Sequence, residues 1–583
     1  MANRNVPRAA IPITNPNKPV VEPNGKGGES PPDASPTSNG VGTPLNHPSA
    51  TVAADTPRPT FKPPDNTWNS LDMGGLNLKN LPQTSGLFAF TFLTSLYLNH
   101  NNLSIVPPQI AKLRHLKLLD LSANNLASLP PELGMLTQLK ELYLYDNQLP
   151  TLPHQLGTLH QLQTLGIEGN PLDAEIKTIL QKDGTTSLIA YLRDSCPVVD
   201  PPPQRSWNYL ITQQERDAMD QDPYLETFTV LSYNILCEKY ATERLYGYTP
   251  AWALPWNYRK ELILTELLNS DADFLCLQEV AISQYEDYFF PRLREHGYMG
   301  AYWPKSRAKT MSDVDRRLVD GCATFYKHDK YVINIPTCPV LIYFRYKLVE
   351  KHLIELSAIA MQRQDFKKTD DMFNRVLGRD HIAVVCQMEN IQTGSRVIVS
   401  NIHTFWDATY RDVKLVQVAL LLEEIEKIAN GFAKYPPPPP KPAPKEGDPV
   451  DESQPYPPRP PPIYSDGYKI PVVVAGDFNS MPDSSVYEFL SSGSLAPNHP
   501  DFMGHVYGRY TSEGLRHRLN LKSAYAAPGS KEPITNFTPS FRGELDYLWY
   551  SSANLSVNAV LGEVDKSYLD KSVGFPNAHF PSE

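Results

Sequence analysis

The chain has 583 residues and a formal net charge of −10. That length exceeds what one hydrophobic core supports, so we expect two or more domains joined by linkers. The acidic balance argues against a protein that coats nucleic acid through a broad basic surface, and any such contact should be confined to a cleft. Six scattered cysteines without a CxxC pair favour free thiols in a reducing compartment, and no apolar run approaches the ~20 residues of a membrane span. We therefore expect an intracellular protein with no membrane partner.

Residues 1–66 are rich in Pro, Gly, Ser, Thr and Asn and contain few aromatic side chains. Such a composition cannot bury enough apolar surface to offset the entropy of the chain. We expect this segment to be a disordered tail.

The next segment repeats itself with a period of 23 residues, in the pattern LxxLxLxxNxLxxLP. The repeats begin at Leu93, Leu116, Leu139 and Leu162, and the asparagines in phase are Asn101, Asn124, Asn147 and Asn170. This period and the buried asparagine are typical of leucine-rich repeats, in which each unit supplies one short strand. We predict a repeat solenoid over residues 67–195. A degenerate unit near Leu71 would be its N-terminal cap and a helix over 173–193 its C-terminal cap. A solenoid of this size is usually a docking surface.

Residues 196–226 contain four prolines near their start and are expected to be a connector. From 227 to 583, short β-rich runs alternate with helical stretches, which predicts a layered α/β sandwich. The expected strands are 227–233, 274–277, 381–385, 397–402 and 472–475, and the expected helices are 258–270 and 413–429. A proline-rich insertion at 435–463 should form an extended surface loop, either a plain spacer or an SH3 or WW ligand.

Several of these strands end in an acid or an amide, where α/β enzymes place their sites. The residues are Asn234, Glu279, Asp477, Asn479 and, at the start of a late strand, Asp546. Without a cysteine or histidine cluster, this oxygen-only set suits Mg²⁺ or Mn²⁺ rather than zinc. Metal-assisted hydrolysis of a phosphodiester is the chemistry that such a set serves.

Together and in this order, the motifs resemble the endonuclease/exonuclease/phosphatase superfamily, whose pattern runs strand-Asn, LQE, N-x-H, GD-x-N and a late Asp. Longer strings decide the branch, among them VLSYNILCEKYAT, PKSRAKTMSDVDRRLVDGCATFYK, DVKLVQVALLLEE and DFNSMPDSSVYEFL. They resemble the carbon catabolite repressor protein 4 family, the poly(A)-specific nucleases of the mRNA deadenylation complex, over about residues 70–583. The resemblance implies a leucine-rich repeat solenoid followed by a four-layer α/β sandwich.

The resemblance also implies roles for individual residues. Glu279 would bind the metal, with Asn234 supporting metal and phosphate, Asp477 orienting or deprotonating the attacking water, and Asp546 completing the acidic site. The remaining candidates are substrate contacts: Asn479 and His403 at the scissile phosphate, Asn536 and Phe541 at the adenine, and Asp315 as a looser acidic match. Ala408 departs from the family, which carries a proline there beside the base.

The implied activity is stepwise 3′-to-5′ removal of 5′-AMP from poly(A) RNA with two Mg²⁺ ions, Mn²⁺ being the other candidate. The solenoid would dock the chain on the scaffold and the second deadenylase subunit of the complex, in the cytoplasm and also in the nucleus. Two alternatives stay open. The first is a catalytically impaired scaffold subunit of the same complex. The second is another Mg-dependent phosphodiesterase or inositol phosphatase, although Ser480 and Met481 stand where the inositol phosphatases carry a basic signature.

The end of the chain, Phe580-Pro581-Ser582-Glu583, falls where the family places Ser-Asp-His before its last strand. We expect Glu583 to take the position of that aspartate, and we expect the chain to be a truncated, slower form of an active enzyme. His579 could replace the missing histidine only by a backbone shift of several residues.

Overall fold

The computed structural model describes residues 68–222, 225–330, 343–438, 460–526 and 533–582. The expected tail at 1–66 lies outside these residues, as does most of the proline-rich insertion at 435–463. Two compact units are present. The first comprises the described residues up to Leu152 together with Gln161–Gln181, and the second comprises Pro153–His160 and the chain from Lys182 onward. The division falls inside the helix expected as the C-terminal cap, near a kink at Gly184, whereas the sequence placed a domain boundary at 195.

The first unit is a leucine-rich repeat solenoid, as predicted. Its parallel sheet runs in the order β1-β2-β3-β4-β5, and helix α1 (Ala174–Asp194) follows it. The strands are β1 (Ser70–Asp72), β2 (Ser95–Tyr97), β3 (Leu118–Asp120), β4 (Glu141–Tyr143) and β5 (Thr164–Gly166).

The in-phase asparagines connect successive repeats. Asn147 Nδ2 donates to the carbonyl oxygens of Leu121, at 3.0 Å, and Leu144, at 3.1 Å, while its Oδ1 accepts from the Leu126 amide at 3.0 Å. Asn124 makes the same set of bonds one repeat earlier. Because a buried backbone group without a partner is costly, one amide per turn fixes the spacing of the solenoid.

The second unit contains two sheets that pack face to face. A four-stranded sheet has the order β7-β8-β10-β9, and a six-stranded sheet has the order β13-β14-β15-β16-β22-β19. The strands of the first are β7 (Val230–Asn234), β8 (Phe274–Ala281), β9 (Tyr298–Pro304) and β10 (Asp320–Lys327). Those of the second are β13 (Tyr346–Glu355), β14 (Ile382–Asn390), β15 (Arg396–His403), β16 (Val472–Asp477), β19 (Leu521–Ser523) and β22 (Asp546–Ser551).

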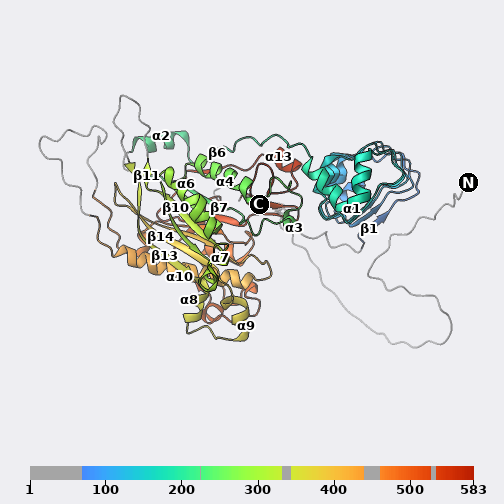
Figure 1. Cartoon of the computed structure of the whole chain (residues 1–583). Coiled ribbons are helices and arrows are strands. Elements are labelled where there is room, and N and C mark those ends of the chain that lie inside the picture. The colour runs from blue at the N-terminus through green and yellow to red at the C-terminus, as the bar shows by residue number, and fades with distance from the viewer. Residues whose placement is uncertain (1–67, 223–224, 331–342, 439–459, 527–532, 583) are drawn as a thin grey trace, which may run out of the picture. The chain divides into compact units, whose positions relative to one another are not determined.

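Helices cover the outer face of each sheet, so the unit has four layers (Figure 1). In β8, Leu275 and Leu277 pack toward α4 (Trp256–Ser270), while Phe274 and Cys276 pack between the sheets. Because both faces are buried, the first half of β8, residues 274–277, is a continuous apolar run without the alternation of a half-exposed strand. The other covering helices are α6 (Phe290–Glu295) on the first sheet, and α8 (Leu356–Gln362), α10 (Arg411–Ala433) and α11 (Ser485–Ser492) by the second. The predicted α/β sandwich is confirmed.

The segment at 196–226, expected to be a connector, contains regular structure. Strand β6 (Trp207–Tyr209) pairs antiparallel with β23 (Ala559–Leu561), and helix α2 (Gln213–Gln221) follows it. The strand expected at 227–233 begins three residues later, because the Thr229 amide bonds the Asp273 carboxylate at 2.9 Å. The sequence did not predict these contacts, because the segments that make them are short and show neither a clear periodicity nor an apolar run.

Among the described residues, none of the helices has the length and apolarity needed to cross a bilayer.

The second unit also contains shorter helices and strands. They are α3 (Glu243–Tyr246), α5 (Ile282–Gln284), α7 (Asp313–Arg316), α9 (Asp370–Met372), α12 (Arg509–Ser512) and α13 (Lys566–Lys571), with the strands β11 (Asp329–Lys330), β12 (Tyr343–Phe344), β17 (Ser494–Leu495), β18 (Leu515–Arg516), β20 (Asn536–Thr538) and β21 (Phe541–Gly543).

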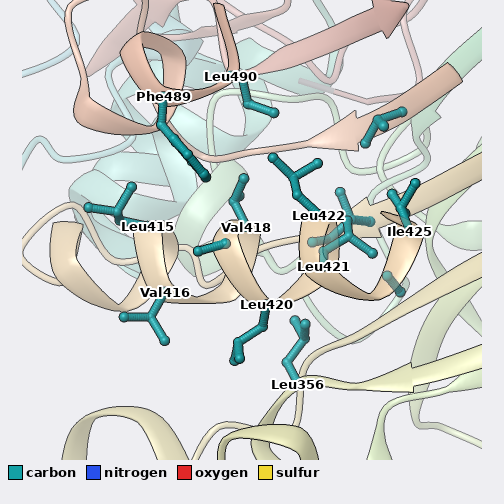
Figure 2. Packing of buried hydrophobic residues seen from close by; sticks show 14 of the residues in the cluster. Leu356, Leu415, Val416, Val418, Leu420, Leu421, Leu422, Ile425, Phe489 and Leu490 are labelled. Carbon is teal, nitrogen blue, oxygen red and sulfur yellow. The ribbon is translucent and has the colours of Figure 1, made fainter. Parts of the chain in front are cut away.

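Helix α10 is apolar on most of its circumference because it lies between other elements. Figure 2 shows Leu420 and Leu356 on one side of α10, and Phe489 and Leu490 on the opposite side. All four side chains are nearly inaccessible to solvent. We predict that Leu420→Ala lowers the free energy of unfolding by about 2–5 kcal/mol, since it leaves a cavity in a close-packed core.

Chemical denaturation followed by circular dichroism would measure this loss for the second unit. The matched control is Lys427→Ala on the same helix, whose side chain is 66% exposed, and which should change stability by less than about 0.5 kcal/mol. Equal unfolding midpoints for the two variants would contradict the buried position of Leu420.

Candidate active site

The predicted acids and amides come together where the two sheets meet. Asn234 ends β7 in the first sheet and Asp477 ends β16 in the second, and Asn234 Nδ2 donates to Asp477 Oδ2 at 3.0 Å. In the second sheet, Asp477 is paired with His403 of β15 on one side and Asp546 of β22 on the other. Glu279 lies in β8, next to β7. Of these residues Asp477 and His403 are buried, and the others are half-buried.

Backbone geometry that ordinary strands avoid positions two of these side chains. Glu279 has a φ of +61° at a register shift between β8 and β10, and its Oε2 accepts a hydrogen bond from the Cys237 amide at 2.9 Å. Asn479 has a φ of +47°, and its own amide donates to Asp477 Oδ1 at 2.8 Å. Left-handed conformations of non-glycine residues are strained and concentrate at functional sites.

Gly476 precedes Asp477 with a φ of +155°. A Cβ atom at this position would lie 2.0 Å from the Ile402 carbonyl oxygen. Only glycine therefore allows β15 and β16 to approach closely enough to place His403 beside Asp477.

Buried amides connect the sheets beneath the site. Gln278 Nε2 of β8 donates to Asn401 Oδ1 of β15 at 2.8 Å, and Asn401 Nδ2 donates to the carbonyl oxygens of Leu277, at 3.1 Å, and Ala323, at 3.0 Å. Both side chains are inaccessible to solvent. Since a buried amide must be hydrogen-bonded, these contacts fix one sheet against the other.

His403 lies with Nε2 3.7 Å from Asp477 Oδ2. Burial lowers the pKa of His403, and the carboxylate of Asp477 opposes part of that shift. The imidazole is therefore neutral at pH 7 and can offer one N–H to a phosphate oxygen.

The sequence analysis missed a buried lysine that supports the site. Lys414 on α10 donates its ammonium to the carbonyl oxygen of Asn479, and burial lowers its pKa to about 8 against the attraction of Asp477. Its signal was a lysine in the first turn of a helix, directly before the mostly apolar stretch 415–422.

A second missed feature is the buried carboxylate of Asp320, at the start of β10. Lys239 Nζ and Lys305 Nζ each lie 2.7 Å from its oxygens, and Arg307 Nη2 lies at 2.8 Å. Burial alone would raise the pKa of Asp320, but the ammonium groups of Lys305 and Lys239 hold it well below its usual range. This cluster carries excess positive charge, and Glu279 is among the charges that act on Lys305.

The predicted adenine contacts lie on a separate hairpin beside the acids. Asn536 begins β20 and Phe541 begins β21, and both are half-buried. Thr535 Oγ1, next to Asn536, accepts hydrogen bonds from the amides of Leu545 at 2.9 Å and Asp546 at 3.0 Å, which joins the hairpin to the acidic site.

Two other candidates, Asp315 and His579, have hydrogen-bond partners outside this cluster. Asp315 is exposed on α7, and Ser312 Oγ donates to its carboxylate at 2.7 Å. His579 Nε2 lies 2.8 Å from the Val199 carbonyl oxygen, a contact that takes it away from the acids. Ser582 lies nearer to them, because its Oγ donates to the carbonyl oxygen of Asn234 at 2.7 Å.

A surface cavity of about 500 Å³ lined in part by Arg363, Glu423 and Tyr510 includes none of the predicted site residues.

Among the residues that the structure describes, no three His, Cys, Asp or Glu side chains are spaced to hold a metal ion by themselves. The donors present still suit Mg²⁺, which is usually held by one or two carboxylates, waters and substrate phosphates rather than by an all-protein cage. Carboxylate oxygens of Glu279, Asp477 and Asp546 and the amide oxygen of Asn234 are hard ligands of this kind.

Two packed sheets with these acids and amides where they meet define an endonuclease/exonuclease/phosphatase domain. A model of the Endonuclease/Exonuclease/phosphatase family matches residues 231–431 and 432–568 of the chain. A leucine rich repeat model matches residues 91–149 and 114–172. Over 595 residues the chain is 49% identical to "CCR4-Not complex 3'-5'-exoribonuclease subunit Ccr4" of Mycosarcoma maydis, covering 100% of this chain and 84% of that protein. The protein of the same description from Schizosaccharomyces pombe is 49% identical over 537 residues, covering 88% and 73%. The chain belongs to the family of Ccr4 exoribonuclease subunits.

A solved structure with a similar fold is that of ANGEL2, a 2′,3′-cyclic phosphatase. It is 23% identical, covers 66% of this chain and 96% of that one, and has a TM-score of 0.45. That likeness carries no weight for the function of this chain.

The second buried histidine near the site, His381, should make stability depend on pH. Burial lowers its pKa well below the usual value, and Lys305 and His403 lower it further. In the unfolded chain this histidine binds a proton as the pH falls through about 6.5, whereas in the folded chain it does not. Stability is therefore complete above about pH 6.5 and decreases as the pH falls below it.

We predict that His381→Asn makes the decrease in melting temperature between about pH 7 and pH 5 smaller than in the wild type. The exposed His296 supplies the control, since His296→Asn should leave that decrease unchanged. A decrease of the same size in wild type and His381→Asn would show that His381 is not held neutral.

Proposed function

We propose that the chain is a 3′-to-5′ exoribonuclease that shortens poly(A) tails of mRNA and releases 5′-AMP, as the catalytic subunit of a deadenylation complex. The observation that carries this proposal is the hydrogen bond between Asn234 and Asp477, which joins the polar ends of two sheets into one site. Relatives 49% identical to the chain are named as 3′-5′ exoribonuclease subunits.

Nucleases of this superfamily generally depend on a divalent metal ion. We propose Mg²⁺ at two positions, held by Glu279 and Asn234 on the first sheet and by Asp477 and Asp546 on the second. When bound, such ions polarise the phosphoryl oxygens and lower the pKa of an attacking water.

The residues of the chain supply orientation and proton transfer. Asp477 is held by two hydrogen bonds, from Asn234 Nδ2 and the Asn479 amide, so it is oriented to accept a proton from the attacking water. His403 and the side-chain amide of Asn479, whose Nδ2 also donates to the Thr404 carbonyl oxygen at 3.2 Å, would donate to the non-bridging oxygens of the scissile phosphate, where negative charge develops. Lys414 fixes the Asn479 turn from below.

The preference for adenine is assigned to the β20–β21 hairpin. The Phe541 ring would stack on the terminal base and the Asn536 amide would hydrogen-bond its edge, a combination that reads single-stranded RNA. Asp315 on α7 is proposed as an acidic contact to the substrate.

We predict that Asp477→Asn slows release of 5′-AMP from oligo(A) by about 100-fold or more, because the amide cannot accept the proton of the water. The substitution preserves shape, so circular dichroism and melting temperature should stay close to wild type. Asp313→Asn is the matched control, since that side chain is 97% exposed, and it should retain full activity. Retention of more than about a tenth of the wild-type rate by Asp477→Asn would refute the assignment.

A gel assay of RNA cleavage, run beside a phosphate-release assay, separates the alternatives. Cleavage of oligo(A) faster than oligo(U) supports the poly(A) exonuclease. Release of phosphate from a phosphoinositide without RNA cleavage would support the inositol phosphatase instead. No turnover of either substrate by the wild type would support a scaffold subunit.

The leucine-rich repeats are proposed to bind the scaffold and the second deadenylase subunit of the complex. Tyr97, Asp120 and Tyr143 lie side by side on β2, β3 and β4, because their strands pair in register, and solenoids bind partners through such extended faces. Tyrosines in these positions supply large contact area.

We predict that the double substitution Tyr97→Ala and Tyr143→Ala weakens binding to these subunits at least about tenfold and leaves hydrolysis of short oligo(A) unchanged. Glu132→Ala, at an exposed position outside the strands, is the control and should bind normally. Surface plasmon resonance with the purified partner subunits would measure both. Undiminished binding by the tyrosine variant would place the interface elsewhere.

A further inference from the structure

The indole of Trp406 is 70% exposed, although it stands three residues after His403 at the active site. We infer that Trp406 is a stacking platform for a base of single-stranded RNA, in the part of the chain that remains after the terminal nucleotide is removed. This inference rests on the proposed function and adds to it a binding subsite for the body of the substrate.

The loop that carries Trp406 is held on both sides. Before it, the Thr404 amide donates to the Asp477 carbonyl oxygen at 3.0 Å, and the Phe405 amide donates to Oε1 of the buried Gln417 at 2.9 Å. After it, Asp407 Oδ1 accepts from the Thr409 amide at 2.8 Å. The exposure of Trp406 is therefore imposed by a fixed backbone, and an ordered aromatic ring loses little entropy when it binds.

The neighbouring aromatic ring points inward and anchors the loop. Phe405 is 7% exposed and packs edge-on against His381, at 5.6 Å between centroids, and Tyr410, at 5.2 Å. The Arg379 guanidinium lies 4.2 Å from the Phe405 ring centroid. The ring centroids of Trp406 and Phe405 are 6.0 Å apart and their planes are tilted by 52°, and 70% of the indole stays accessible.

Charges around the loop suit an RNA backbone in an otherwise acidic chain. Arg411 is 57% exposed beside the loop, with Asp501 at 2.9 Å as its partner, and Arg379 lies over Phe405 and Tyr410. The carboxylate within the loop, Asp407, accepts both hydrogen bonds of Thr409. An exposed aromatic face on a loop that has one arginine packed against its inner rings and another at its end suits single-stranded nucleic acid, which stacks its bases without hydrogen-bond readout.

The position of the loop indicates which base is bound. Three residues of chain place the Trp406 Cα within about 11 Å of the His403 Cα, close to the scissile phosphate. The terminal adenine is assigned to Asn536 and Phe541, which lie on a different hairpin. Because the terminal adenine is assigned to these two residues, we assign Trp406 to a base on the 5′ side of the scissile phosphate.

The test compares Trp406→Leu and Trp406→Phe in the full chain with Mg²⁺, using oligo(A) substrates. Loss of the stacking face in Trp406→Leu should raise KM for a ten-nucleotide oligo(A) about 5- to 150-fold and change kcat by less than about threefold. Trp406→Phe keeps a π-face and should remain within about threefold of wild type. Trp207→Leu is the matched control, because Trp207 is 47% exposed on β6, and it should leave KM unchanged.

Oligo(A) with a single abasic site near its 3′ end identifies the base. In the wild type, one upstream abasic position should raise KM, and in Trp406→Leu the same position should have no further effect. An unchanged KM for Trp406→Leu, or an equal additional loss at every abasic position, would overturn the inference. Wild-type inactivity on oligo(A) would instead reject the proposed function, so the two failures are distinguishable.

Discussion

The hydrogen bond from Asn234 to Asp477 is the contact on which the site depends, because its two residues come from different sheets. Each sheet alone supplies only part of the polar groups: Asn234 and Glu279 come from the first, and His403, Asp477 and Asp546 come from the second. The groups can act together only if the sheets hold one position relative to each other. The buried pair Gln278 and Asn401 provides that constraint, since any slip would break the hydrogen bonds that Gln278 Nε2 and Asn401 Nδ2 donate between the sheets.

The same constraint explains the strained backbone at the site. Glu279 and Asn479 adopt positive φ angles, and each has a hydrogen bond that stabilises its unusual geometry. Strain of this kind persists only where the surroundings hold the backbone in place. At Asn479 the paired strands β15, β16 and β22 and Lys414 of helix α10 do so. The large core thus maintains a few side chains in an arrangement that an isolated strand would not adopt.

Sequence patterns predicted the elements whose signal is local. The 23-residue period identified the solenoid, and Asn234 and Asp477 located the ends of β7 and β16, whereas β8 continues past Glu279 to Ala281. Features that depend on contacts distant in sequence could not be predicted: the irregularity at Glu279 requires β10, and the roles of Lys414 and Asp320 require partners on other elements. The pairing of β6 with β23 joins residues more than three hundred positions apart and left no pattern in either segment.

The central claim is that Asn234 and Asp477 act as one unit across the two sheets. A double-mutant cycle on the turnover of oligo(A), with Asn234→Ala, Asp477→Ala and the double variant, measures this directly. The account predicts strong non-additivity, with the double variant within about threefold of the slower single variant, since either change disrupts the same unit. Losses that multiply would contradict it, because they would show that the two residues act independently.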